Sequence, residues 1–170
     1  MHNDLKLDNI LIGYKDPSLI YLIDFGLSCR YLNDDGTHVQ KIYTQKFSGN
    51  FLFASLNSCR GNNKSRRDDI QSIMYIMIYL LNKSFLPWAD FHKKFEDTSY
   101  KFKDFLWERL DLKYTKEVFK LIPRSLREML KKILTLHFEE EPDYDNIISK
   151  LTAEIQKLVL IGPDLQPVMH

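Results

Sequence analysis

The sequence contains only two cysteines, and Cys29 and Cys59 do not have the paired-ligand spacing of a zinc site. We expect two free thiols in a reducing compartment, with a single disulfide as the alternative. The longest uninterrupted apolar run, residues 73–81, is far shorter than the ~20 residues that a membrane-spanning helix needs. The sequence does not open with the basic stretch and apolar core of a signal peptide. We therefore expect an intracellular protein, in the cytoplasm and/or the nucleus.

The chain also has almost no excess charge, with a formal net charge of +1. No overall field attracts nucleic acid or an anionic membrane, so neither is expected as a partner. The local "KSRR" cluster, residues 64–67, has two interpretations, an anion site or a solvated surface loop. Hydrophobic residues make up 44% of the 170 residues and aromatic residues 13%, which argues against disorder and suffices for the core of one domain. The oligomeric state is left open.

Two short apolar runs, "NILIG" at residues 9–13 and "LIYLIDF" at residues 19–25, lie close together near the start of the sequence. The residues between them include Asp16-Pro17-Ser18, which favour a turn, so the two runs predict a β-hairpin. Residues 26–67 are polar and show little periodicity. Because long loops without regular structure are rare in compact domains, this segment is expected to be functional.

The rest of the sequence has helical patterns. Residues 69–82 are apolar almost all the way round, which predicts a buried central helix, ended by the proline of "FLPW". A weaker pattern covers residues 99–112. Two further helical stripes follow, one of Leu126, Met129, Leu130, Ile133 and Leu134, and one of Ile147, Ile148, Leu151, Ile155, Leu158 and Val159 after a cap at Asp143. The expected fold is mainly α (α+β), with a short β-hairpin and a helical bundle.

Four polar residues, two on the opening loop and two at the ends of the predicted strands, could carry chemistry together. The Asp4 carboxylate could orient a hydroxyl and accept its proton, and Lys6 could neutralise charge on a transferred group. Asn9 offers a carbonyl oxygen, a hard ligand that suits Mg²⁺, and the hairpin would bring Asp24 beside it. This set predicts metal-assisted phosphoryl transfer. Taken singly, each residue is more often a cap or a turn residue.

The sequence "HNDLKLDN" followed by "DFG" resembles the catalytic loop and the metal-binding motif of eukaryotic protein kinases. Further segments resemble the casein kinase I family: "DFGLSCRY", "THV", "FASLN", "SRRDDIQSIMY", "LPW" and "FEEEPDY". That family has a Ser-Ile-Asn type stretch where most kinases have Ala-Pro-Glu, and "SLN" stands there in this chain. The similarity extends from His2 to about Leu158.

The resemblance implies an ATP- and Mg²⁺-dependent protein serine/threonine kinase that acts on Ser or Thr of protein substrates. In the catalytic loop, residues 2–9, Asp4 would be the catalytic base and Lys6 would contact the γ-phosphate. Asn9 and Asp24 would hold Mg²⁺. Lys6 also favours Ser/Thr over Tyr as the acceptor.

The resemblance also implies supporting roles. His2, Phe25 and Gly26 would be structural, and Asp69 would hydrogen-bond the backbone around His2. The activation segment, residues 24–57, would end in a substrate loop that contains Gly49, Asn50 and Ser55. The helical part would cover residues 69–161 of a domain spanning residues 1–161, and residues 162–170 would form a tail.

The sequence departs from the kinase pattern in several places. It has no G-x-G-x-x-G motif, strand lysine or hinge, so it resembles the C-terminal lobe of a protein-kinase-like fold with the N-terminal lobe absent, inactive or nearly so alone. Asn3 replaces an arginine that could bind a phosphorylated activation segment. Asn50 replaces a threonine whose hydroxyl ties the activation segment to the catalytic loop, a bond that an amide could imitate. Leu52 replaces an arginine that binds an anion on the substrate.

The sequence leaves two alternatives to a catalytic protein kinase. One is a non-catalytic pseudokinase or binding module. The other is a small-molecule kinase of the choline or aminoglycoside phosphotransferase type, which shares an H-x-D-x-x-x-x-N loop. Lys6, the glycine of "DFG" and the "RRDDI" segment argue against the second alternative.

Overall fold

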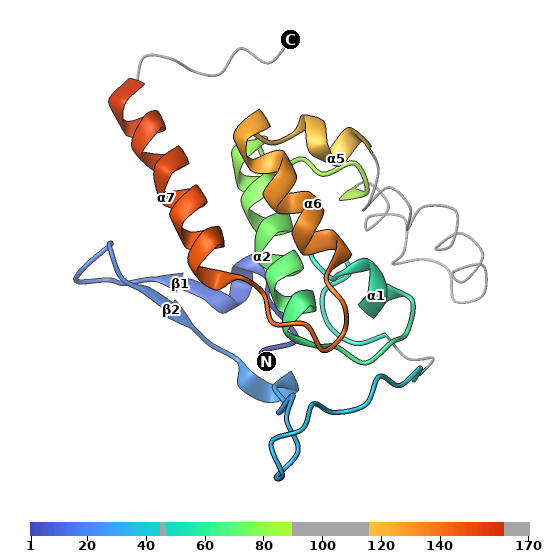
Figure 1. Ribbon diagram of the computed structural model, residues 1–170. Coiled ribbons are helices and arrows are strands. Elements are labelled where there is room, and N and C mark those ends of the chain that lie inside the picture. Colours follow the sequence, from blue (N-terminus) through green and yellow to red (C-terminus); the bar gives the residue numbers. More distant parts are fainter. Residues whose placement is uncertain (45–46, 90–115, 162–170) are drawn as a thin grey trace.

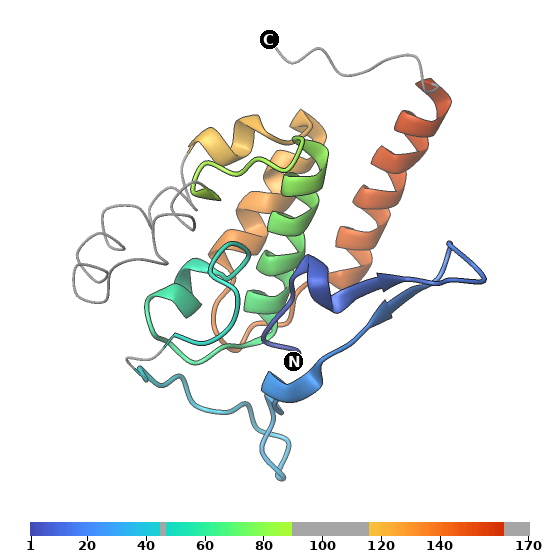
Figure 2. The ribbon, with the colours of Figure 1, turned by 180° about the vertical axis from the view of Figure 1, so that it is seen from behind.

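The computed structural model describes residues 1–44, 47–89 and 116–161. The three longest helices in this part of the chain are α2 (Arg66–Leu81), α6 (Arg127–Thr135) and α7 (Tyr144–Ile161). The two strands β1 (Ile10–Ile12) and β2 (Ile20–Leu22) form an antiparallel hairpin that projects away from the helices (Figures 1 and 2). The predicted combination of a short hairpin and several helices is confirmed.

The hairpin has the position and the turn that the sequence predicts. The Asp16 carboxylate accepts hydrogen bonds from the backbone N–H and the hydroxyl of Ser18, at 2.9 and 2.6 Å. Gly13 lies at the end of the ladder. A side chain does not fit there, because a Cβ would lie 2.4 Å from the Asp16 carbonyl oxygen. The strands pair in the register Ile10 to Leu22, Leu11 to Tyr21 and Ile12 to Ile20.

The polar segment between the hairpin and α2 is largely irregular, as predicted. Its described residues contain a 3₁₀ turn, η2 (Phe25–Leu27), and a one-turn helix, α1 (Leu56–Cys59). Isolated bridges between Leu32 and His38 and between Tyr43 and Asn62 hold the rest of the segment together. Cys29 is exposed and Cys59 is partly buried, and no disulfide joins them.

Helix α2 forms the centre of the described core. It begins at Arg66, three residues earlier than the sequence predicts, because Ser65 and Asp68 cap it: the Ser65 N–H donates to the Asp68 carboxylate at 2.7 Å. Tyr75 and Ile78 of α2 are fully buried. The predicted buried central helix is therefore confirmed.

The end of α2 differs from the prediction. The helix stops at Leu81, before the proline of "FLPW", because Lys83 and Ser84 adopt left-handed conformations with φ of 53° and 63°. The Asn82 side chain caps the end by donating to the carbonyl oxygens of Ile78, at 2.7 Å, and of Leu121, at 2.8 Å. Proline was therefore the wrong stop signal.

Helix α6 packs on α2 through the predicted apolar stripe. A short helix, α5 (Lys116–Lys120), and a 3₁₀ turn, η4 (Arg124–Leu126), lead into it. The Gln71 side chain of α2 donates to the Ile133 carbonyl oxygen at 3.1 Å, which joins the two helices through their buried faces. The core around this contact includes Leu5, Phe53, Met74, Leu86, Trp88, Val118, Leu126, Met129 and Leu130.

Helix α7 is less buried than its apolar stripe predicts. Its start is as predicted, since the Asp143 carboxylate accepts the Asn146 N–H at 3.1 Å. Ile147 and Leu151 pack against the core, but 61% of Ile148 and 57% of Ile155 are exposed. Only part of the apolar stripe of α7 faces the core, because α7 lies apart from α2 and α6 (Figure 1).

Some predictions lie outside the described residues. These are the helical pattern at 99–112, the tail at 162–170 and the side chains of Leu158 and Val159. In the part of the chain that is described, no helix is both long and apolar enough to cross a membrane.

The two arginines of the "KSRR" cluster are part of the fold. Arg67 is buried, donates to the Leu136 carbonyl oxygen at 2.9 Å and lies over the Phe138 ring. Arg66 pairs with the Glu141 carboxylate at 3.3 Å. Neither an anion site nor a solvated loop describes these two side chains, because the connection between α6 and α7 supplies their partners.

Candidate active site

The loop that carries Asp4 is fastened to α2 by one carboxylate. The backbone N–H groups of His2 and Asn3 donate to the two Asp69 oxygens at 2.7 and 2.9 Å. Asn3 has a φ of 68°, a left-handed conformation that a non-glycine residue rarely adopts. This is the contact that the kinase resemblance implies for Asp69, and it holds the loop in a strained turn.

His2 joins the loop to the end of β2. Its Nδ1 accepts the Asp4 N–H at 3.3 Å, so the ring proton lies on Nε2, which donates to the Ile23 carbonyl oxygen at 2.9 Å. The ring is buried and stacks at a tilt against Phe25, with centroids 5.2 Å apart. Both ring nitrogens are engaged in the scaffold, so the geometry gives His2 a structural role.

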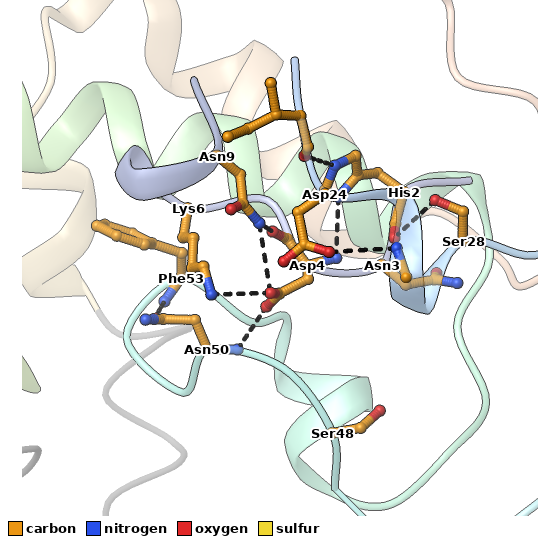
Figure 3. Close-up of polar contacts among 12 residues, drawn as sticks. His2, Asn3, Asp4, Lys6, Asn9, Asp24, Ser28, Ser48, Asn50 and Phe53 are labelled. Atoms are coloured by element: carbon orange, nitrogen blue, oxygen red, sulfur yellow. Dashed lines mark hydrogen bonds and ion pairs between the residues drawn. The ribbon is translucent and has the colours of Figure 1, made fainter. Parts of the chain in front are cut away.

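The Asp4 carboxylate is buried and receives three donors, two from the catalytic loop itself and one from the substrate loop (Figure 3). Lys6 Nζ lies 3.0 Å away, Asn9 Nδ2 lies 3.4 Å away, and the Asn50 backbone N–H donates at 3.0 Å. The hydrogen bond and charge of Asp4 raise the pKa of Lys6, which stays protonated. The result is a carboxylate acceptor held in place beside a cation.

Asn9 and Asp24 lie on the same side of the hairpin base (Figure 3). The Ile23 N–H donates to the Asn9 carbonyl oxygen at 3.0 Å, which extends the strand ladder and places Asp24 next to Asn9. Asn9 Nδ2 donates to the Asp4 carbonyl oxygen at 2.9 Å, so the Oδ1 of Asn9 is the atom that a cation could use. Asp24 adopts a left-handed conformation with a φ of 62° and caps the η2 turn.

The donor set of this pair fits a hard cation such as Mg²⁺. Asp24 offers carboxylate oxygens and Asn9 an amide oxygen, which are hard ligands. Among the described residues no group of three or more His, Cys, Asp or Glu side chains could hold a metal alone. A Mg²⁺ bound here would therefore need further oxygens, such as those of phosphate groups, as Mg²⁺ sites commonly do.

Asn50 makes its tie to Asp4 with its backbone N–H, and not with the side-chain amide that could have imitated the threonine hydroxyl. The amide Oδ1 turns back and accepts the Phe53 N–H at 3.2 Å. The preceding Gly49, with a φ of 102°, permits this approach, because a Cβ at that position would lie 3.1 Å from the Asp4 carboxylate. The expectation that the Asn50 amide imitates a threonine hydroxyl is therefore wrong.

Ser55 supports the substrate loop from beneath. Its hydroxyl is buried, donates to the Asp68 carboxylate and accepts the Ser58 N–H at 3.0 Å, which caps α1. Burial raises the pKa of Asp68 despite these bonds. Ser55 was predicted within the substrate loop, and the structure gives it an anchoring contact to α2.

Two further residues of this region were not predicted as part of the site. The Asn3 side chain donates from Nδ2 to the Leu27 carbonyl oxygen at 2.8 Å and to the Cys29 sulfur at 3.1 Å, which fastens the start of the activation segment. Lys64 donates to the carbonyl oxygens of Asn3 and Ser48. The sequence marks Lys64 only as part of the "KSRR" cluster and does not indicate these two partners, which are 61 and 16 residues away.

Comparison with known proteins agrees with this geometry. A model of the protein kinase domain matches residues 1–150. The "Probable casein kinase I homolog" of Encephalitozoon cuniculi is 36% identical over 89% of this chain and 46% of its own length. Casein kinase I homolog 3 of Schizosaccharomyces pombe is 32% identical over 88% of this chain and 34% of its own. A casein kinase 1-like protein of Oryza sativa is 30% identical over 99% of this chain and 23% of its own.

The chain therefore belongs to the protein kinase domain family. Within that family it resembles casein kinase I, as the sequence motifs predicted. The chain spans less than half the length of each of these relatives.

Proposed function

We propose that this chain is the catalytic-loop-bearing part of a casein kinase I-like protein serine/threonine kinase. The observation that carries this proposal is the set of three donors on the buried Asp4 carboxylate, from Lys6, Asn9 and the Asn50 backbone. Phosphoryl transfer depends mainly on positioning and on charge stabilisation, and this set provides both.

In the proposed reaction, Asp4 orients the hydroxyl of a Ser or Thr in a protein substrate and accepts its proton. Lys6 neutralises charge on the transferred γ-phosphoryl group of ATP, and its raised pKa keeps it cationic for that task. Asn9 Oδ1 and the Asp24 carboxylate would hold Mg²⁺, which when bound neutralises charge on phosphate oxygens.

The 170 residues are proposed to correspond to the large, C-terminal lobe of the kinase, with the domain at residues 1–161 and a tail at 162–170. The proposal is supported by the exposed hairpin, whose apolar side chains point to solvent on both faces, and by the share of each relative that the chain covers. A kinase also needs a cover over ATP, which the resemblance places in a second lobe. We therefore expect this chain alone to transfer phosphate negligibly.

We propose that this kinase does not share a preference for acidic or pre-phosphorylated substrate sites. Leu52 is half-buried, packs against the core and accepts the Trp88 indole N–H with its carbonyl oxygen at 2.7 Å. At this position the family has an arginine, whose guanidinium can bind an anion on the substrate, and the Leu52 side chain cannot do so. The proposed location of the kinase is the cytoplasm and/or the nucleus.

A Mn²⁺ titration tests the metal site without requiring activity. Mn²⁺ prefers the same oxygen ligands as Mg²⁺ and broadens nearby amide signals in nuclear magnetic resonance spectra. With Mn²⁺ and ATP, we expect broadening of the Asn9 and Gly26 amides, and its loss in Asp24→Asn. Asp34→Asn, which changes an exposed carboxylate on the same segment, should leave the broadening intact. Absence of site-specific broadening in the unchanged chain would contradict the proposed metal site.

Labelling of casein with Mg-ATP tests the reaction itself. The unchanged chain is expected to give little or no signal, because the described residues provide no cover over the nucleotide. Strong labelling that disappears in Asp4→Asn would show that the chain is active alone and would overturn its proposed dependence on a second lobe. Strong labelling that survives in Asp4→Asn would overturn the role proposed for Asp4.

The exposed hairpin predicts self-association. The cross-strand pair Ile12 and Ile20 is 72% and 70% exposed, and such apolar surface favours association. Replacing both with threonine, which keeps the strand preference, should lower light scattering of concentrated protein. Ile42→Thr, at an exposed position outside the hairpin, is the matched control. A clean monomer of the unchanged chain at high concentration would count against the prediction.

A further inference from the structure

Lys64 lies beneath the catalytic loop, and none of the roles assigned above uses it. Its side chain is half-buried, and its ammonium donates to two backbone carbonyl oxygens, those of Asn3 and, at 2.8 Å, Ser48. Asn3 immediately precedes Asp4, and Ser48 immediately precedes Gly49 and Asn50. One cation therefore joins the two segments that meet at the Asp4 carboxylate.

The two segments are otherwise joined by a few contacts. The Asn50 N–H donates to Asp4, while the Asn50 side chain is used within its own loop, toward Phe53. The family's threonine hydroxyl, which would tie these segments, is missing here because Asn50 stands in its place. A charged donor with two carbonyl partners can supply the missing tie, since hydrogen bonds from charged groups are stronger than neutral ones.

The approach of the two segments is tight around the Lys64 ammonium. A Cβ built at Gly49 would lie 3.2 Å from Lys64 Nζ, 3.2 Å from the Asn3 carbonyl oxygen and 3.1 Å from the Asp4 carboxylate. A small space beside them, whose lining includes Asn3, Asp4 and Lys64, is about 10 Å³, at the lower limit for a single water molecule. Burial lowers the pKa of Lys64, while the charges of Asp69 and Asp4 oppose that change.

We propose that Lys64 is a positioning residue that fastens the substrate loop to the catalytic loop and so fixes Asp4 relative to the acceptor hydroxyl. It acts through the Asn3 and Ser48 carbonyl oxygens and touches no reacting atom. The contribution of Lys64 to catalysis rests on the kinase function proposed above, but its two hydrogen bonds do not depend on that function. Because the cation is the side chain of Lys64 itself, this tie does not require a phosphate group on the activation segment.

Amide hydrogen exchange tests the fastening directly. In Lys64→Met, the Asn50 amide should exchange about tenfold faster or more, because the loop that presents it to Asp4 loses two charged hydrogen bonds. Lys64→Gln, which keeps a donor for one carbonyl, should give a smaller increase. Amides in the middle of α6 should be unchanged, which separates local release from unfolding. Lys131→Met, which removes an exposed lysine of α6, is the matched control.

The unchanged chain offers a second measurement that needs no stable variant. An ammonium group bound to two carbonyl oxygens exchanges its protons slowly, so Lys64 should give a side-chain ammonium signal at near-neutral pH. That signal should be lost in Lys64→Met and kept in Lys131→Met. Unaltered Asn50 exchange in Lys64→Met, or the absence of a signal that depends on Lys64, would overturn the proposal. If Asn50 exchange and the ammonium signal both depend on Lys64 but the tests of the metal site and of phosphoryl transfer contradict the proposed function, only the kinase function is overturned.

Discussion

Replacing Leu130 with alanine is expected to lower the free energy of unfolding by about 2–5 kcal/mol. Leu130 has an exposed fraction of 0% and belongs to the core in which α6 packs on α2. The substitution removes buried methyl groups and leaves a cavity that the two helices cannot fully close. Urea denaturation followed by circular dichroism measures the change.

Ile155→Ala on α7 is the matched control, since the sequence places both residues on apolar helical stripes but 57% of Ile155 is exposed. We expect Ile155→Ala to cost less than about 1 kcal/mol. Leu130→Met, which nearly conserves volume, should cost less than about 1.5 kcal/mol and shows whether the cavity is responsible. Equal losses in Leu130→Ala and Ile155→Ala would contradict the packing described for α6 and α7.

Replacing Asp69 with alanine is expected to have the second large effect on stability. The carboxylate accepts the backbone N–H groups of His2 and Asn3, and hydrogen bonds to a charged group contribute roughly 1.5–3 kcal/mol each. Because the two N–H groups would lose their acceptor in a partly buried site, we expect a loss of about 2–5 kcal/mol in urea denaturation.

A smaller change at the same residue separates stability from loop geometry. Asp69→Asn keeps one acceptor oxygen but turns an amide group toward the second N–H, so the loss should be intermediate. Asp34→Ala, at an exposed carboxylate paired with an exposed Arg30, should leave the denaturation midpoint unchanged. Wild-type stability in Asp69→Ala would mean that α2 does not hold the loop.

The sequence determined those features whose signals are local. The Asp16-Pro17-Ser18 turn sets the hairpin because its hydrogen bonds span only two or three residues. The apolar composition of α2 was enough to predict a buried helix, since few other environments accept it. The protein kinase family was also recognised from the sequence, because its motif residues occur at fixed short spacings.

Tertiary structure decided what depends on distant contacts. The stripe of α7 was as apolar as that of α6, yet the placement of α7 leaves Ile148 and Ile155 exposed. The side chain of Asn50 was given the wrong partner, because nothing in its neighbourhood shows that its backbone N–H reaches Asp4, 46 residues away. The contacts of Lys64 could not be inferred from the "KSRR" cluster, since they depend on two carbonyl groups that only the folded chain brings together.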